Sequence, residues 1–360
     1  MKYRSLLFLG LLLFATATYA QSKNDFNIIA YYSAGPEKVD SLPAGKLTHI
    51  IFSFCHLKGN KLTVDNKRDS LTITKLVGLK KQNPKLKIIL SLGGWGGCSS
   101  CSDAFSTIEG IKEFSQSVLA LNRSYGSDGL DLDWEYPAIE GYPGHAYKPE
   151  DKQNFTKLVQ ELRKTLGTQY EISFAAGGFQ KFLDESTEWK AVMKEVDRVN
   201  VMSYDLINGY STVTGHHTAF YNTPSQKEST HNAVQYLIRA GVPRDKIVIG
   251  AAFYARVWEN VPPEKNGLYQ PGKFKMGVDY KDFPEKLTGF QFYWDETAKA
   301  PYAYNPAQKL FATFDDKKSL GLKTKYVIDE KLDGIMFWEL SGDTYKDGLV
   351  DAIYNVKVNN

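Results

Sequence analysis

The sequence of 360 residues predicts a (β/α)8 TIM barrel, in which eight parallel strands alternate with eight helices. The first observation is the alternation itself, because eight strand-like apolar runs occur along the chain and all but the first are followed by a helical pattern. The second is that most of these runs are continuously apolar, as expected for parallel strands that are covered on both faces. The third is the length, which suits one large α/β domain.

The first half of the chain contains four of the predicted strands. A turn-rich stretch follows the first strand, and a glycine cluster follows the third. Pro84 ends the first helix, because proline lacks the N–H group that a helix interior needs. The predicted strands are 27–32, 48–55, 87–92 and the acidic stretch 128–137, and the predicted helices are 70–82 and 111–119.

The second half contains four more strands and the clearest helix of the chain. In residues 150–166, Phe155, Leu158 and Leu162 share one stripe, and Gly167 follows as a cap. The remaining predicted strands are 171–176, 198–204, 247–254 and 333–338, and the remaining predicted helices are 189–196, 230–240, 319–331 and 347–355.

One long segment, residues 257–318, interrupts this alternation. It is aromatic and punctuated by proline and glycine, with strand-like runs at 289–294 and 311–314. We therefore predict a small α+β insertion after the seventh strand. The barrel itself would comprise residues 21–256 and 319–360.

The first twenty residues have the pattern of a signal peptide. Lys2 and Arg4 precede the apolar run 6–14, and small residues lead to Ala20. Removal of residues 1–20 would leave an exported chain without a membrane span, which is secreted, periplasmic or attached to the cell surface. In such a compartment Cys98 and Cys101 can form a disulfide, although the sequence leaves their state open. The net charge of +3 is too small to predict nucleic acid as a partner, and we expect a monomer.

The acidic strand carries the main candidate for chemistry. Side chains alternate along a strand, so Asp131, Asp133 and Glu135 share one face, each roughly 6.6 Å from the next. Crowding of like charges raises the pKa of at least one carboxyl, which suits a general acid. The alternation is equally typical of a half-buried strand with a wet face. A calcium loop fits poorly, because it needs glycine where Tyr136 stands.

Aromatic residues and carboxylates also occur at the C-terminal ends of the other predicted strands, where barrel active sites lie. Any single aromatic ring there is well explained by core packing, but the whole set on one rim indicates platforms for sugar rings. The glycine cluster 93–97 lacks the spacing of a dinucleotide fingerprint. It predicts a tight turn at which Gly94 lets a ligand approach the backbone, with Trp95 as a platform.

These motifs resemble those of family-18 glycoside hydrolases, specifically the chitinases. The signature Asp-x-x-Asp-x-Asp-x-Glu stands at residues 128–135 and continues as Trp-Glu-Tyr-Pro. The segments 91–95, 202–205 and 254–256 and the strand that ends at Trp338 match as well, so the resemblance covers nearly all of the chain after the leader. Ala255 replaces the glycine that is commoner in the family.

The resemblance implies an enzyme that cleaves chitin or chitooligosaccharides, which are β-1,4-linked N-acetylglucosamine chains, without a metal or organic cofactor. The acetamido oxygen of the substrate would be the nucleophile, an exception among retaining glycosidases. Glu135 would be the general acid and base, Asp133 would support the acetamido group, and Asp131 would tune Asp133. The resemblance further assigns Tyr204 and Asp205 to catalysis, Asp128 to a structural role at the strand start, and Tyr31, Phe54, Gly94, Trp95, Tyr136, Met202, Tyr254, Arg256 and Trp338 to substrate binding.

Three other functions are compatible with the same sequence. A carbohydrate-binding barrel without catalysis is disfavoured, because relatives of that kind usually lack the acid at the Glu135 or Asp133 position. An endo-β-N-acetylglucosaminidase acting on glycoproteins would share the carboxylates, but it generally lacks the Trp-Glu-Tyr-Pro run and the insertion. A structural or adhesive protein would need repeats or a second module, and the sequence contains neither. Cleavage at chain ends and internal cleavage are both compatible with the motifs.

Overall fold

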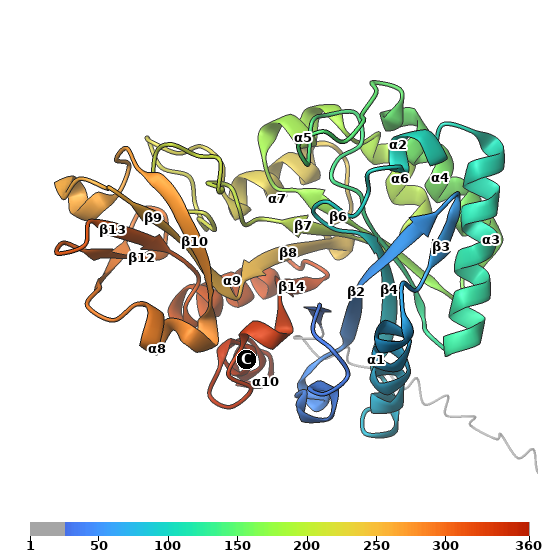
Figure 1. The fold of residues 1–360 in the computed structure, drawn as a ribbon, viewed down its shortest axis with the longest axis horizontal. Coiled ribbons are helices and arrows are strands. Elements are labelled where there is room, and N and C mark those ends of the chain that lie inside the picture. The colour runs from blue at the N-terminus through green and yellow to red at the C-terminus, as the bar shows by residue number, and fades with distance from the viewer. Residues whose placement is uncertain (1–25, 360) are drawn as a thin grey trace, which may run out of the picture.

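The computed structural model describes residues 26–359 and contains a closed barrel of eight parallel strands (Figure 1). The strand order is β1-β14-β8-β7-β6-β5-β4-β2, and pairing of β1 with β2 closes the ring. The predicted (β/α)8 barrel is therefore confirmed. Its strands are β1 (Asn27–Tyr32), β2 (His49–Lys58), β4 (Lys87–Gly93), β5 (Gly129–Asp133), β6 (Glu171–Gly177), β7 (Arg198–Met202), β8 (Ile247–Ala252) and β14 (Gly334–Trp338).

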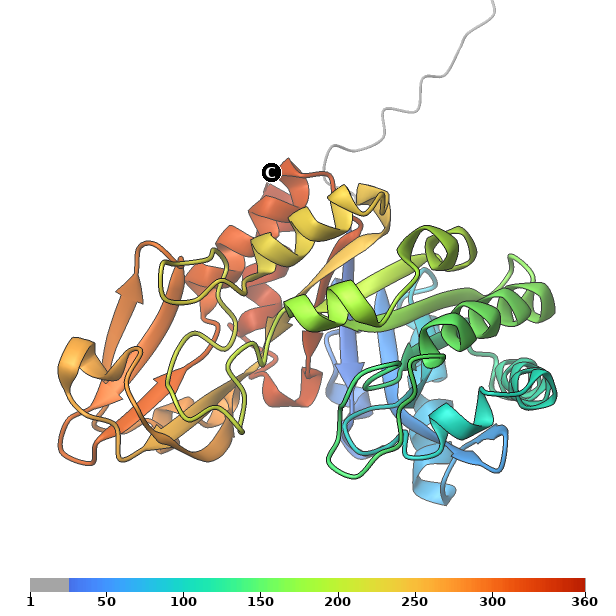
Figure 2. The same ribbon diagram turned by 90° about the horizontal axis from the view of Figure 1, so that it is seen from above.

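Helices cover the outside of this barrel, as the view from above shows (Figure 2). The predicted helices are present, most with ends displaced by a few residues, but the helix predicted over 111–119 is twice as long, because α3 extends from Ile108 to Tyr125. The short helices α2 and α5 and the short strand β3 (Lys61–Thr63), which pairs with β2, were not predicted. The α-helices outside the second sheet are α1 (Lys67–Gly78), α2 (Cys101–Ala104), α3 (Ile108–Tyr125), α4 (Asp151–Leu166), α5 (Gln180–Glu185), α6 (Trp189–Glu195), α7 (Thr230–Arg239), α9 (Lys317–Asp329) and α10 (Leu349–Asn359).

A second, antiparallel sheet lies beside the barrel, at the left of Figure 1. Its strand order is β10-β9-β13-β12-β11. All five strands come from the chain between β8 and α9, which agrees with an insertion after the seventh barrel strand. The elements are β9 (Tyr254–Glu259), β10 (Lys273–Asp279), α8 (Phe283–Lys286), β11 (Gln291–Asp295), β12 (Ala300–Asn305) and β13 (Leu310–Thr313).

The prediction of one strand over residues 247–254 was wrong. The barrel strand β8 ends at Ala252, and β9 of the second sheet begins at Tyr254, so only Phe253 separates the two sheets. Phe253 is buried, stacks on Phe337 with ring centroids 4.1 Å apart, and donates its N–H to the carbonyl oxygen of Trp338. The sequence has no glycine or proline at this point, so the strand pattern continues through the change of sheet.

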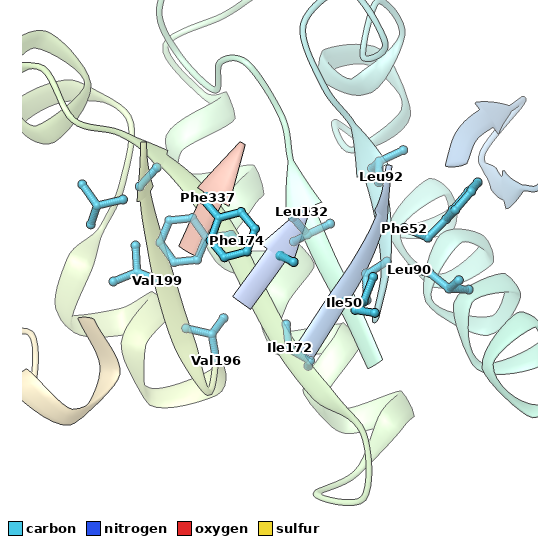
Figure 3. Packing of buried hydrophobic residues seen from close by; sticks show 14 of the residues in the cluster. Ile50, Phe52, Leu90, Leu92, Leu132, Ile172, Phe174, Val196, Val199 and Phe337 are labelled. Carbon is cyan, nitrogen blue, oxygen red and sulfur yellow. The ribbon is translucent and has the colours of Figure 1, made fainter. Parts of the chain in front are cut away.

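The main apolar core lies between the strands and the surrounding helices (Figure 3). Along β5, Leu130 and Leu132 enter this outer core and are at most 1% exposed, while Asp131 and Asp133 point into the barrel. Burying each leucine contributes about 1.5–3 kcal/mol, and a shift by one residue would turn both leucines inward. The outer core therefore fixes which side chains face the barrel interior.

The structure also shows the state of the three cysteines and whether a helix of the described chain could span a membrane. Cys98 and Cys101 are joined by a disulfide, whereas Cys55 is free and buried. No helix within residues 26–359 is both long enough and apolar enough to span a membrane. The predicted signal peptide, residues 1–20, lies outside the described part of the chain.

Candidate active site

Asp131 is at the bottom of the acidic row and has no exposed surface. The strand register places Ser91 of β4 and Ser173 of β6 beside it, and both hydroxyls donate to its carboxylate, at 3.0 and 2.6 Å. Tyr31 and Asn200 donate two further hydrogen bonds, at 3.0 and 3.1 Å. Burial raises the pKa of Asp131, although these four hydrogen bonds oppose the rise.

Asp133 lies two residues further along β5, with the same orientation, and is only 4% exposed. Burial is the main cause that raises its pKa well above the usual value, and the charges of Glu135 and Asp131 add to it. No hydrogen-bond donor of the described chain reaches its Oδ1 atom. Asp133 therefore holds a proton more readily than an ordinary aspartate, and its Oδ1 atom is available to accept a hydrogen bond from a bound molecule.

Glu135 follows the end of β5 and is partly exposed to the groove described below. Burial raises the pKa of Glu135 to about 7; the hydrogen bond from Tyr136 opposes this, and the charge of Asp205 adds to it. A carboxyl with a pKa near 7 is half protonated at neutral pH. This is the condition that a side chain needs to act first as a general acid and then as a general base.

Asp205 lies just beyond β7, with a positive φ of 55°, and is held by donors from two other segments. The Tyr254 hydroxyl donates to Oδ1 at 2.8 Å, Arg256 donates to both carboxylate oxygens, and His217 Nδ1 lies 3.4 Å from Oδ1. Burial alone would raise the pKa of Asp205, but the hydrogen bonds from Arg256 and His217 lower it below the usual range. Asp205 is therefore a fixed negative charge beside Glu135.

Aromatic rings form the floor of the site. Trp338, at the end of β14, stacks on Phe54 with ring centroids 5.6 Å apart. The Tyr31 ring also packs against Trp338, with ring centroids 5.9 Å apart.

Burial, with the charges of Asp133 and Glu135, raises the pKa of Tyr204 well above its usual value. Tyr204 thus keeps its proton and remains a hydrogen-bond donor at neutral pH.

A groove of about 1190 Å³ crosses the C-terminal ends of the barrel strands. Eleven of the sequence-predicted site residues line it, and these are Phe54, Trp95, Asp133, Glu135, Tyr136, Met202, Tyr204, Asp205, Tyr254, Arg256 and Trp338. Gly277 and Phe274 of β10 also line it, so one wall belongs to the second sheet. A volume of this size, lined by rings and a few polar groups, is typical of a ligand-binding site.

Four predicted residues lie elsewhere. Tyr31 and Asp131 are beneath the groove, where Tyr31 donates to the Asp131 carboxylate. Gly94 is buried, and a Cβ atom at this position would lie 2.3 Å from the Phe54 ring, so the glycine makes room for that ring. Asp128, which precedes β5, accepts a hydrogen bond from the backbone N–H of Ile88 and pairs with Lys80.

Two aromatic residues beside Trp95 were missed from the sequence. Tyr142 and Tyr210 have ring centroids 5.6 and 6.4 Å from that of Trp95, and Tyr210 lines the groove. The Trp95 side chain is 48% exposed and Tyr210 is 65% exposed, so their ring faces are accessible. Both tyrosines belong to long loops, and only an inspection of these loops for exposed aromatic residues could have found them. Among the described residues, no three His, Cys, Asp or Glu side chains are grouped as metal ligands.

The chain combines a (β/α)8 barrel with a groove across the strand ends that contains crowded carboxyls and accessible aromatic rings. This combination of fold and site is that of a glycoside hydrolase. Residues 27–343 match the sequence model of Glycosyl hydrolases family 18, and the chain belongs to this family. Chitinase A1 of Niallia circulans is 36% identical over 301 residues, which cover 76% of this chain and 43% of that protein. Chitinase B of Serratia marcescens is 29% identical over 389 residues, with coverage of 86% and 76%.

Solved structures give the same family. A family 18 N-acetylglucosaminidase from Paenibacillus barengoltzii superposes with a TM-score of 0.83 at 36% identity, covering 92% of this chain and all of that one. A chitinase from Bacillus thuringiensis superposes with a TM-score of 0.86 at 29% identity, covering 93% of this chain and 70% of that chain. The chain thus spans less than half the length of the Niallia circulans relative and most or all of the two solved structures.

Proposed function

We propose that the protein is a chitinase, which hydrolyses β-1,4-linked N-acetylglucosamine polymers by a substrate-assisted mechanism with retention of configuration. The observation that carries this proposal is the pairing of two carboxyls with different tasks. Glu135 has a pKa of about 7, and the buried Asp133 beside it has an oxygen that receives no hydrogen bond from the described chain. One group can donate a proton to a leaving oxygen while the other accepts a hydrogen bond from an acetamido N–H.

In the first step, Glu135 protonates the glycosidic oxygen as the bond to the anomeric carbon breaks. The acetamido oxygen of the same sugar forms the new bond to that carbon and gives an oxazolinium ion. Asp133 holds the acetamido N–H and stabilises the positive charge, and its coupling with Asp131 and Glu135 makes the three acids titrate as a set. Glu135, now a carboxylate, then takes a proton from the water that opens the ring.

The surrounding side chains would position the sugar. Tyr204 keeps its hydroxyl proton and can donate a hydrogen bond to the acetamido oxygen. Asp205 can accept hydrogen bonds from the same sugar. Trp338 would be the floor under this sugar, because its ring lines the groove and packs against Phe54 and Tyr31. Trp95 would stack on the next sugar on the leaving-group side.

The rate should depend on pH through Glu135. Its folded-state pKa is raised, so the acid form is populated below about pH 7 and is lost as the pH rises through this value. We expect kcat/KM on a soluble chitooligosaccharide to fall about tenfold per pH unit well above pH 7. A profile that stays level from pH 6 to pH 9 would contradict the assignment of Glu135 as the acid.

The stereochemical outcome is a second test. Attack by the acetamido oxygen and then by water inverts the anomeric carbon twice, so the first product from a β-linked substrate should be the β-anomer. Proton NMR within the first minutes of hydrolysis distinguishes the anomers before they equilibrate. An initial α-anomer would rule out the substrate-assisted route and leave an inverting reaction.

A second candidate is removal of single N-acetylglucosamine units, because one of the solved structures that this chain matches over its full length is described as an N-acetylglucosaminidase. Chitin hexamer separates the two functions, since mainly dimeric products support the chitinase and mainly monomeric products support the alternative.

We also propose that residues 1–20 direct export and that the mature chain acts as a monomer outside the cytoplasm. Residues 257–318 would form the insertion beside a barrel of residues 21–256 and 319–360, although residues 254–256 already belong to β9 of the second sheet.

A further inference from the structure

His217 is a fully buried histidine that lies outside the set of predicted site residues and touches one of them. Its Nδ1 atom is 3.4 Å from Asp205 Oδ1, and its ring centroid is 5.1 Å from that of Tyr254. We propose that His217 is a positioning residue for the reaction, which orients the Asp205 carboxylate by donating from Nδ1. The effect of His217 on catalysis rests on the proposed function, whereas the contacts of His217 with Asp205 and Tyr254 do not depend on it.

The backbone around His217 holds its ring in place. Its N–H donates to the Thr313 hydroxyl of β13, and its carbonyl oxygen accepts the N–H of Leu206, next to Asp205. His217 thus joins the start of the loop after β7 to the second sheet, at Leu206, which follows the positive-φ residue Asp205. A residue fixed to both segments can hold Asp205 in a conformation that few non-glycine residues adopt.

The protonation of the ring follows from its surroundings. Burial lowers the pKa of His217, so the ring is neutral at pH 7 and carries one proton. Its Nε2 atom is buried and has no hydrogen-bond partner in the described chain, so a proton there would be a buried donor without an acceptor. A proton on Nδ1 instead faces the Asp205 carboxylate. The Asp205 backbone N–H points at Nδ1 over 3.5 Å, the outer limit of a hydrogen bond, and this weak contact is given up when Nδ1 carries the proton.

The consequence for Asp205 is an unequal use of its two oxygens. Oδ1 would receive three donors, from Tyr254, Arg256 and His217, whereas Oδ2 receives only an Arg256 N–H in the described chain. Oδ2 therefore keeps a free lone pair for a hydroxyl or N–H group of the bound sugar. Without the His217 donor, the carboxylate could rotate about its terminal torsion, which is intrinsically broad.

Kinetics of two variants separate a donor from a packing role. His217→Asn places an amide N–H near the position of Nδ1, whereas His217→Leu fills the space without a donor. We expect Leu to lower kcat/KM on chitin hexamer about 10–100-fold, as for a lost hydrogen bond to a charged group, and Asn to recover most of that loss. A Leu variant as active as the Asn variant would overturn the proposal.

His216→Asn is the matched control, because His216 is equally buried but its Nε2 contacts Asp295 of β11, in the second sheet. Its loss should lower thermal stability and leave kcat/KM within about twofold of the wild-type value. A loss of kcat/KM as large as that of the His217→Leu variant would show a general effect of the buried loop and would overturn the specific role of His217.

A spectroscopic test does not depend on the substrate. Nitrogen-15 chemical shifts of the six histidines, with His217 identified by its absence in the Asn variant, should show a neutral ring with the proton on Nδ1. A proton on Nε2 would overturn the proposal. If the wild-type protein cleaves no chitin hexamer, the proposed function fails while this measurement still decides the state of His217.

Discussion

Replacement of Glu135 by Gln is expected to lower kcat on chitin hexamer about 10²–10⁴-fold, because the amide cannot donate a proton to the leaving oxygen. Binding should persist, since Gln has the same shape and the groove walls do not change. The measurement is product release by chromatography together with calorimetric binding of the uncleaved hexamer. Glu109→Gln, an exposed change in α3 away from the groove, is the control and should leave both quantities unchanged.

The same Glu135→Gln variant should become more stable relative to the wild-type protein as the pH rises. The pKa of Glu135 is about 7 in the folded protein against an ordinary value of 4.5, so the folded state binds the proton more tightly. The free energy of unfolding contributed by this group is therefore largest below pH 4.5 and decreases until about pH 7. Gln has no such loss, so its thermal midpoint should exceed that of the wild type at pH 8 by more than at pH 4. A variant that is inactive and also less stable at pH 8 would indicate misfolding instead of a lost proton donor.

Replacement of Lys323 by Met is expected to destabilise the fold by about 3–5 kcal/mol, because it leaves a buried charge without its partner. Lys323 on α9 and Asp315 are both fully buried, and the ammonium lies 2.8 Å from the carboxylate. Lys323 also donates to Thr218, in the loop after β7, and Asp315 accepts the N–H of Ala252 at the end of β8. The pair therefore connects three segments that converge behind the groove.

Urea denaturation with a matched control tests this pair. Lys325→Met changes an exposed lysine on the same helix, paired with Asp329, and should cost no more than about 0.5 kcal/mol. Asp315→Asn combined with Lys323→Met should be less destabilising than the sum of the single changes, since the double variant contains no unpaired charge. Equal destabilisation by Lys323→Met and Lys325→Met would show that the buried pair adds nothing to stability.

The sequence predicted the barrel because its signal is repeated along the whole chain. Continuous apolar runs such as that of β8 and striped helices such as α4 each indicate one element, and their repeated alternation in a chain of this length is typical of a closed parallel barrel. The side-chain alternation in β5 was equally informative. It predicted that Asp131 and Asp133 face the same way, and burial of Leu130 and Leu132 is the physical reason.

Other features depend on contacts between distant segments and could not be predicted in this way. Tyr254 and Arg256 were predicted at the end of a barrel strand, but they belong to β9 of the second sheet. The adjacent His216 and His217 lie in a loop and contact different carboxylates, and no periodic pattern in the sequence indicates these contacts. Tyr142 and Tyr210 were overlooked because loop conformation leaves little trace in sequence periodicity.

The single residue between β8 and β9 determines how the groove can respond to a polymer. Phe253 is buried and stacked on Phe337, so the barrel strand β8 passes directly into β9 of the sheet that forms one wall of the groove. A rigid joint of this kind means that binding does not have to order or close a moving domain, which reduces its entropic cost. The groove is then a fixed template, and a flexible sugar chain must adopt the shape of the protein.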